Sequence, residues 1–278
     1  MRNDCPVQIR FYFSACRKLD QLFVLIRACW IGVWLGLLDR ETLHLLDKCC
    51  YDLWSEYHTE AHNRKGLTAW EVGAITNYFS ACRRLLVAGI GGGRELLALC
   101  QLGYEPDGFE CHPELAAVAR RLLQSDGFTA EVTVAARDTC PESEKQYDGL
   151  IVGWGAYMLI QAREKRIAFL KAMRATVPAK APLLLSFFHR SPQARRFKII
   201  TFVGNILRRI RRKSLLEVGD SLAPNYVHLF TRDELKVELQ QAGFDLVFYD
   251  SAEYGHAVAL ASDTMADTSP TRNKKLAY

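Results

Sequence analysis

The sequence predicts an α/β fold: a Rossmann-like, doubly wound and mostly parallel sheet, with an N-terminal helical cap and a helical insertion after the fifth strand. Two observations carry this prediction. From residue 85 onward, short β-rich runs alternate with amphipathic helical segments, which is the pattern of a doubly wound sheet. The first of these runs leads into four glycines within five residues, and a helical segment follows directly.

The composition is that of a soluble globular protein with one large core. Of the 278 residues, 49% are hydrophobic and 24% are charged, which excludes a disordered chain, a collagen-like repeat and a small disulfide scaffold. The nine cysteines include no Cys-x-x-Cys, so neither a zinc ribbon nor a secreted disulfide framework is indicated. Asp4 and Asp20 precede the first long apolar run, unlike a secretory signal. We therefore expect a cytoplasmic protein with no metal site.

Residues 1–80 carry helical patterns and little that is typical of a strand, so we expect a helical cap or lid. Its helices are expected over 12–38, from 39 onward and over 68–79. Segment 22–38 has 17 residues and a single charge, Arg27, and is just short of the roughly 20 apolar residues that span a bilayer. We interpret it as a buried or lid helix, with peripheral membrane contact as the alternative.

The Rossmann-like domain is expected over 81–261. Its strands are expected at 85–90, 107–110, 131–135, 148–153, 182–188, 244–249 and 256–261. Its helices are expected at 94–102, 113–123, 162–176 and 231–242, the last opened by a capping box of Thr231 and Glu234. The last two strands are joined by a short link, which favours an antiparallel pair at one sheet edge. Residues 262–278 are polar and aperiodic and predict a disordered tail.

The glycine loop 89–93 is the most informative stretch. A strand that turns tightly on glycines into a helix lets the backbone approach a nucleotide-type ligand closely. A dinucleotide loop, Gly-x-Gly-x-x-Gly or -Ala, would require a small residue at Arg94, so a nicotinamide-dependent oxidoreductase is the weaker alternative. The loop follows the pattern Gly-x-Gly-x-Gly instead.

The strand and loop resemble the first motif of the class I S-adenosylmethionine-dependent methyltransferases, and the resemblance covers about 85–261. It implies S-adenosyl-L-methionine as the cofactor, held at Gly89, Ile90, Gly91 and Gly93. Glu110 ends the second expected strand, 17 residues beyond Gly93. The family places an acid there to accept hydrogen bonds from both ribose hydroxyls.

The resemblance implies further contacts after each following strand. Asp138 lies where the family often places an acidic or polar residue near the adenine amino group. The other expected cofactor contacts are Cys111, Thr139, Trp154 and, from the cap, Tyr57. Val87 departs from the family, which often has an acid there for the ligand's amino group. Glu95 or backbone carbonyls near Gly89 are candidates to replace it.

Methyl transfer from a sulfonium is an in-line displacement, so the protein mainly aligns donor and acceptor and adds a base only where the acceptor holds a proton. The catalytic candidates are His228, His189 and Tyr157, close after expected strands; each histidine could instead be a structural hydrogen bonder. We expect O- or N-methylation of a small hydrophobic or aromatic acceptor. The alternative is a non-catalytic S-adenosylmethionine-binding or partner-binding module.

The basic segment 195–213, inside the expected insertion 190–225, contains eight basic residues and no acid around an apolar centre. The other 28 basic residues of the chain are outnumbered by its 31 acidic ones, so the net charge of +5 is concentrated here. Such a segment indicates an amphipathic element at a membrane surface or over an anionic acceptor, or the solvated face of a lid helix. Nucleic acid is not an expected partner, because no binding motif accompanies the charge. The sequence leaves the oligomeric state open.

Overall fold

The computed structural model describes residues 6–252 and 254–263. Its centre is a seven-stranded sheet with the strand order β3-β2-β1-β4-β5-β9-β8. The strands are β1 (Arg84–Ala88), β2 (Glu105–Glu110), β3 (Val132–Val134), β4 (Gly149–Val152), β5 (Pro182–Phe187), β8 (Phe244–Asp250) and β9 (Gly255–Ala261). Strands β1 to β5 are parallel, and β9 is antiparallel to both β5 and β8. The predicted fold class and the antiparallel pair at the sheet edge are confirmed.

Helices cover both faces of the sheet, which is why its inner strands are apolar on both sides. Helices α7 (Arg163–Arg174) and α9 (Arg232–Gln241) pack on one face, and α4 (Ala69–Tyr78), α5 (Arg94–Gln101) and α6 (Pro113–Ser125) on the other. Thr231 caps α9 as predicted: its Oγ1 accepts from the Glu234 N–H at 3.2 Å, and its own N–H donates to the Glu234 carboxylate at 2.8 Å.

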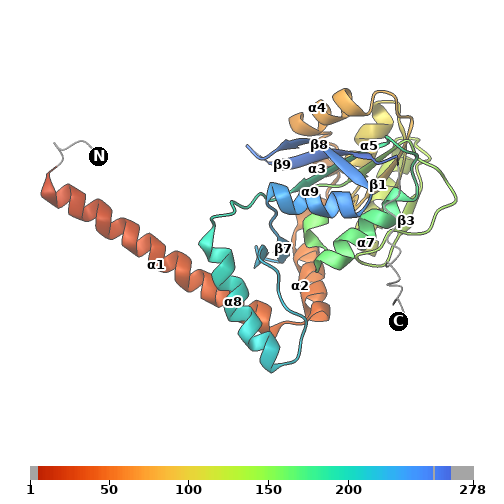
Figure 1. Cartoon of the computed structure of the whole chain (residues 1–278). Coiled ribbons are helices and arrows are strands. Elements are labelled where there is room, and N and C mark those ends of the chain that lie inside the picture. The colour runs from red at the N-terminus through yellow and green to blue at the C-terminus, as the bar shows by residue number, and fades with distance from the viewer. Residues whose placement is uncertain (1–5, 253, 264–278) are drawn as a thin grey trace, which may run out of the picture.

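The described part of the expected cap, residues 6–80, is built of helices that lie in different places. Helix α2 (Arg40–Leu53), the short helix η1 (Ser55–His58) and α3 (Glu60–Asn63) lie over the end of the sheet. Helix α1 (Val7–Leu37) extends away from the sheet instead (Figure 1). The interpretation of 22–38 as a buried helix is wrong, because its buried residues are only Ala28, Gly32, Leu35 and Gly36.

The insertion contains α8 (Arg195–Ile210), which packs alongside the C-terminal part of α1 (Figure 1). Gly32 and Gly36 allow the close approach: a Cβ on Gly32 would lie 2.8 Å from the Ile200 carbonyl oxygen. A two-stranded antiparallel sheet of β6 (Asp220–Leu222) and β7 (Tyr226–His228) follows, which the sequence did not predict. The expected tail lies outside the described residues from 264 onward.

Candidate functional site

A cavity opens at the carboxyl ends of β1, β2 and β4, beneath α2, η1 and α3. In a doubly wound sheet this is the edge where ligands bind. Nine of the ten residues expected to contact a cofactor line this cavity together. They are Gly89, Ile90, Gly91, Glu110, Cys111, Asp138, Thr139, Trp154 and Tyr57.

The glycines of the loop have distinct structural roles. Gly91 has a φ of +53°, and the position that a Cβ would take is open space, so the backbone is exposed to a ligand there. A Cβ on Gly89 would lie 2.6 Å from the Cβ of Ala156. Gly93 does not line the cavity; its φ is +98°, and it packs against Ala119 of α6. Gly93 therefore allows two helices to pack rather than facing a ligand.

Glu110 is the carboxylate that the backbone positions most firmly. Its Oε2 accepts from the Gly91 N–H at 2.8 Å, and its Oε1 accepts from the N–H groups of Cys111 and His112 at 2.8 and 3.0 Å. The residue is only 7% exposed. A carboxylate offers about four acceptor sites, so three backbone bonds leave capacity for a ligand hydroxyl.

Polar groups from α2 meet the loop after β3 at the far end of the cavity. Asp47 forms an ion pair with Arg137 and accepts a hydrogen bond from the side-chain amide of Asn225. His44 Nε2 lies 3.4 Å from Asp138 Oδ2 but is not aligned for a hydrogen bond. Among the described residues, Asp138 Oδ2 and Arg137 Nε are buried without a hydrogen-bond partner. Such groups are suited to a polar ligand, since buried polar atoms are normally paired.

Glu95 and Arg94 line the cavity from the first turn of α5. Glu95 Oε1 accepts from Arg94 Nη2 at 2.7 Å and from the Trp154 N–H at 3.3 Å. Burial raises the pKa of Glu95, although the nearby Arg94 guanidinium opposes this. Arg94 also pairs with Glu71 of α4 at 2.7 Å. The position that an acid often occupies in the family, Val87, is fully enclosed in the core.

The cap adds residues that the sequence analysis did not assign to the site: Asp47, Tyr51, His62 and Asn63. The rings of His62 and Tyr57 meet edge to face with centroids 5.0 Å apart. His62 Nδ1 is buried without a partner among the described residues, and burial lowers the pKa of this imidazole. Asp47 and Tyr51 are four residues apart on α2, so the sequence shows that they share one face of the helix. It does not show that this face covers the cavity.

The three side chains expected to act on the acceptor lie outside this cavity. Tyr157 is fully buried in the core, where its hydroxyl donates to Glu238 Oε2 at 2.7 Å. His189 is exposed, and its Nδ1 lies 2.8 Å from the Tyr249 hydroxyl. His228 lines a separate depression between the insertion and α9. All three residues lie at a strand end or follow one closely in the sequence, but their side chains do not line the cavity. Proximity to a strand end therefore does not by itself bring a side chain into the cavity.

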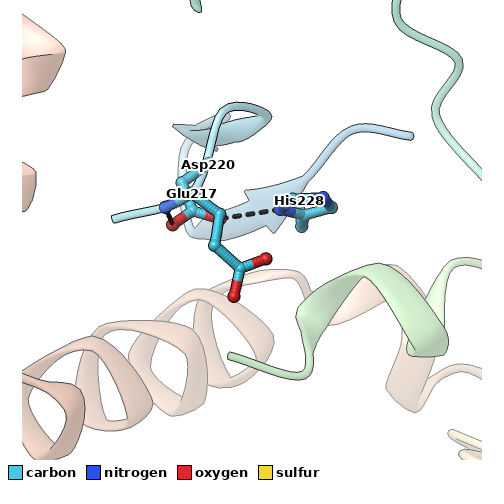
Figure 2. A group of neighbouring side chains, drawn as sticks. All are labelled: Glu217, Asp220 and His228. Atoms are coloured by element: carbon cyan, nitrogen blue, oxygen red, sulfur yellow. Dashed lines mark hydrogen bonds and ion pairs between the residues drawn. The ribbon is translucent and has the colours of Figure 1, made fainter. Parts of the chain in front are cut away.

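His228 belongs to a group with Glu217 and Asp220 that has the composition of a metal site (Figure 2). Its members are already engaged with one another and with a cation. Asp220 Oδ1 accepts from His228 Nδ1 at 2.7 Å, and Asp220 Oδ2 accepts from the Glu217 N–H at 2.8 Å. Glu217 Oε2 pairs with Arg166 at 2.7 Å. A metal ion would have to displace these bonds beside a guanidinium, so the group fits a structural network better.

Known proteins of solved structure share the fold of this chain. No family model and no curated protein matches the sequence. A solved S-adenosylmethionine-dependent methyltransferase from Methanosarcina mazei is 20% identical, with a TM-score of 0.56 over 71% of this chain and 99% of that one. A sugar N-methyltransferase from Streptoalloteichus is 15% identical, with a TM-score of 0.54 over 76% and 92% of the two chains.

A third structure, an amino pentose methyltransferase from Micromonospora echinaspora with bound S-adenosylmethionine, is 16% identical. It covers 74% of this chain and 96% of that one with a TM-score of 0.53. At these identities the likeness concerns the fold. The chain has the Rossmann-like fold of the class I methyltransferases.

Proposed function

We propose that this protein is an enzyme that binds S-adenosyl-L-methionine and transfers its methyl group to a small hydrophobic or aromatic acceptor at oxygen or nitrogen. The observation that carries the proposal is Glu110. Its carboxylate is held by the Gly91 N–H at the carboxyl edge of the sheet, with eight other expected cofactor contacts around the same cavity. Folds do not fix function, so this site and not the fold is the main support.

The residues present suit the parts of this cofactor. Glu110 is suited to the ribose hydroxyls, and the buried, unpartnered oxygen of Asp138 is suited to an amino group such as that of adenine. Gly91, whose Cβ position is open, gives backbone access between these ends, and Gly89 and Ile90 line the cavity beside it. Glu95, which also pairs with Arg94, and the backbone carbonyls near Gly89 are the candidates for the ammonium group in place of the acid absent at Val87. Cys111, Thr139, Trp154 and Tyr57 complete the walls.

The bound cofactor supplies a methyl group already activated by the sulfonium charge, so the protein's task is alignment. Where the acceptor carries a proton, His62, which lines the cavity, is the candidate to remove it. Burial lowers the pKa of His62, so its imidazole is neutral at pH 7 and its unpartnered Nδ1 can accept a proton. His228, His189 and Tyr157 are not given this role, since none of them lines the cavity.

Aromatic side chains support an apolar acceptor. Trp154 lines the cavity and is 45% exposed. Its ring lies 5.3 Å from that of Tyr254, which in turn contacts Phe188 at 5.7 Å. Phe188 is 36% exposed. Exposed rings beside the cavity form a surface on which a planar or apolar acceptor packs favourably.

We also infer a cytoplasmic location with contact to a membrane surface through 22–38 and 195–213. The eight cysteines that the structure describes are all free, in keeping with a reducing compartment. The exposed apolar side chains of α1 and the basic residues of α8 support the membrane contact.

Turnover of the donor tests the proposal. The purified protein is incubated with S-adenosylmethionine and a metabolite extract, and release of S-adenosylhomocysteine is measured. We expect release that depends on the extract, that is reduced in Glu110→Gln and that is unchanged in Glu105→Gln, at the opposite end of β2. Binding without release would support the non-catalytic module instead. Binding of a nicotinamide dinucleotide in the same cavity would support the oxidoreductase.

A further inference from the structure

Helix α1 exposes an apolar stripe along nearly its whole length. The stripe consists of Tyr12, Leu19, Phe23, Ile26, Trp30 and Leu37. Successive members are separated by seven, four, three, four and seven residues, so they lie on one side of the helix. Their exposed fractions run from 42% to 67%. A row of large apolar side chains this exposed marks an interaction surface.

The opposite side of α1 carries polar side chains in its N-terminal half, beside exposed apolar ones such as Val24 and Leu25, and is covered by α8 in its C-terminal part. Arg10, Ser14, Arg17 and Gln21 are spaced by four, three and four residues, and the same line continues through Ala28, Gly32 and Leu35, which face α8. Helix α8 therefore packs on the side away from the apolar stripe. The stripe has no cover from the rest of the described chain.

Helix α8, which packs along α1, carries a concentration of basic residues. Arg195, Arg196, Lys198 and Arg209 are exposed, and three more basic residues follow at 211–213. The segment 195–213 contains no acid. Phe202, Ile206 and Ile210 are exposed among these cations, with fractions of 67%, 43% and 74%. Apolar side chains among cations are typical of elements that bind anionic lipid surfaces.

We propose that α1 and α8 form an interfacial arm that lies flat on an anionic bilayer, with the apolar stripe of α1 inserted among the lipid acyl chains and α8 behind α1, where its cations are attracted by the negative surface potential. This binding deepens the membrane contact inferred above and does not depend on methyl transfer. It names the lipid chemistry, the inserted side chains and the orientation.

Helix α1 is long and apolar enough to pass as a membrane span, but its surroundings favour a flat orientation. Its C-terminal part is held by α8: the Arg208 Nε–H donates to the Leu35 carbonyl oxygen at 2.8 Å. Spanning would draw this basic helix into the hydrocarbon. The remaining part, 7–27, carries five charged residues, at positions 10, 17, 18, 20 and 27, which is too many for a span.

A second copy of the chain is a poorer occupant of the stripe. Each copy would add a segment 195–213 with eight cations and no acid, and the stripe itself has no acid that would complement the other copy's charge. Like charges oppose such an approach, whereas anionic headgroups complement the same charges.

Co-sedimentation with vesicles tests the arm. One set is pure phosphatidylcholine, and the other contains phosphatidylcholine mixed with phosphatidylglycerol. We expect the full chain to sediment with the anionic vesicles and to stay in solution with the neutral ones. The double variant Phe23→Ser/Trp30→Ser should bind at least about tenfold more weakly, because it removes two inserted aromatic side chains. The control Leu102→Ser removes a leucine that is 60% exposed at the C-terminal end of α5, outside the arm.

The charge is tested separately. Arg209→Gln/Arg212→Gln should weaken binding to anionic vesicles, and Lys171→Gln/Lys236→Gln, which removes two exposed lysines outside the arm, should not. All substituted side chains are exposed, so unchanged thermal unfolding verifies the fold. Equal recovery in the supernatant with and without anionic lipid would overturn the proposal. So would a dimer in lipid-free ultracentrifugation that Phe23→Ser/Trp30→Ser converts to a monomer, since a second copy would then cover the stripe.

Discussion

Replacing Glu110 with glutamine perturbs the proposed cofactor site with the smallest change of shape. The carboxylate accepts from three backbone N–H groups, one through Oε2 and two through Oε1. An amide keeps a single oxygen. Its best orientation turns that oxygen to Cys111 and His112, which leaves the amide nitrogen facing the Gly91 N–H. The substitution therefore frees the glycine loop and removes the charge offered to the ribose.

The expected loss of affinity is estimated from the hydrogen bond to the carboxylate that the substitution removes. A hydrogen bond to a charged acceptor contributes about 1.5–3 kcal/mol, and leaving a buried donor unpaired costs a similar amount. Each 1.4 kcal/mol is about tenfold in affinity. We therefore expect Glu110→Gln to weaken binding of S-adenosylhomocysteine by about 10- to 100-fold.

Isothermal titration calorimetry with S-adenosylhomocysteine measures this directly. Glu105→Gln is the matched control, because Glu105 is on the same strand but at the opposite edge of the sheet, with an exposed pairing to Arg83. Circular dichroism verifies that both variants are folded at the titration temperature. An affinity of Glu110→Gln within about threefold of the parent protein would refute the assignment of Glu110 to the ribose.

Three further predictions concern the proposed general base, His62, and two residues with structural roles, Tyr157 and Gly93. His62→Gln should lower kcat by about 100-fold or more while S-adenosylhomocysteine affinity stays the same. Burial lowers the pKa of His62 below its ordinary 6.5, so the rate of the parent protein should fall only as the pH drops through that lowered value. The variant should lack this fall in rate at acid pH. If the variant keeps the pH profile of the parent protein, His62 is not the general base. Tyr157→Phe should lower the free energy of unfolding in urea by about 1–3 kcal/mol, because it deprives buried Glu238 of a donor, and should leave ligand affinity unchanged; a lost affinity would return Tyr157 to the site. Gly93→Ala should destabilise more than Gly103→Ala, by about 1–3 kcal/mol, because both have positive φ but only the Gly93 Cβ would meet Ala119, at 2.9 Å; equal Tm values would contradict the packing role.

The sheet was predictable because its signals are local. The glycine turn at 89–93 and the capping box of Thr231 and Glu234 involve residues close in sequence, and both are present in the structure. The sheet of β6 and β7 escaped prediction, since strands of three residues are too short to show alternation.

The site was predictable in part, for the same physical reason. Glu110 and Asp138 follow strands whose ends meet at one edge, so their positions near the cavity follow from topology. Tyr157 also follows a strand, but its partner Glu238 is 81 residues away, and nothing local announces that bond. His62 lies in a cap whose docking depends on tertiary ion pairs such as Asp47 with Arg137, 90 residues apart. The positions of Tyr157 and His62 both depend on contacts between residues far apart in the sequence.

A crystal structure of the complex with S-adenosylhomocysteine tests the central claim most directly. We expect the ribose hydroxyls within about 2.5–2.8 Å of the Glu110 carboxylate, the adenine beside Asp138, and the sulfur facing the part of the cavity lined by Trp154 and His62. A ligand bound away from Glu110, or a cavity without ligand at saturating concentration, would contradict it.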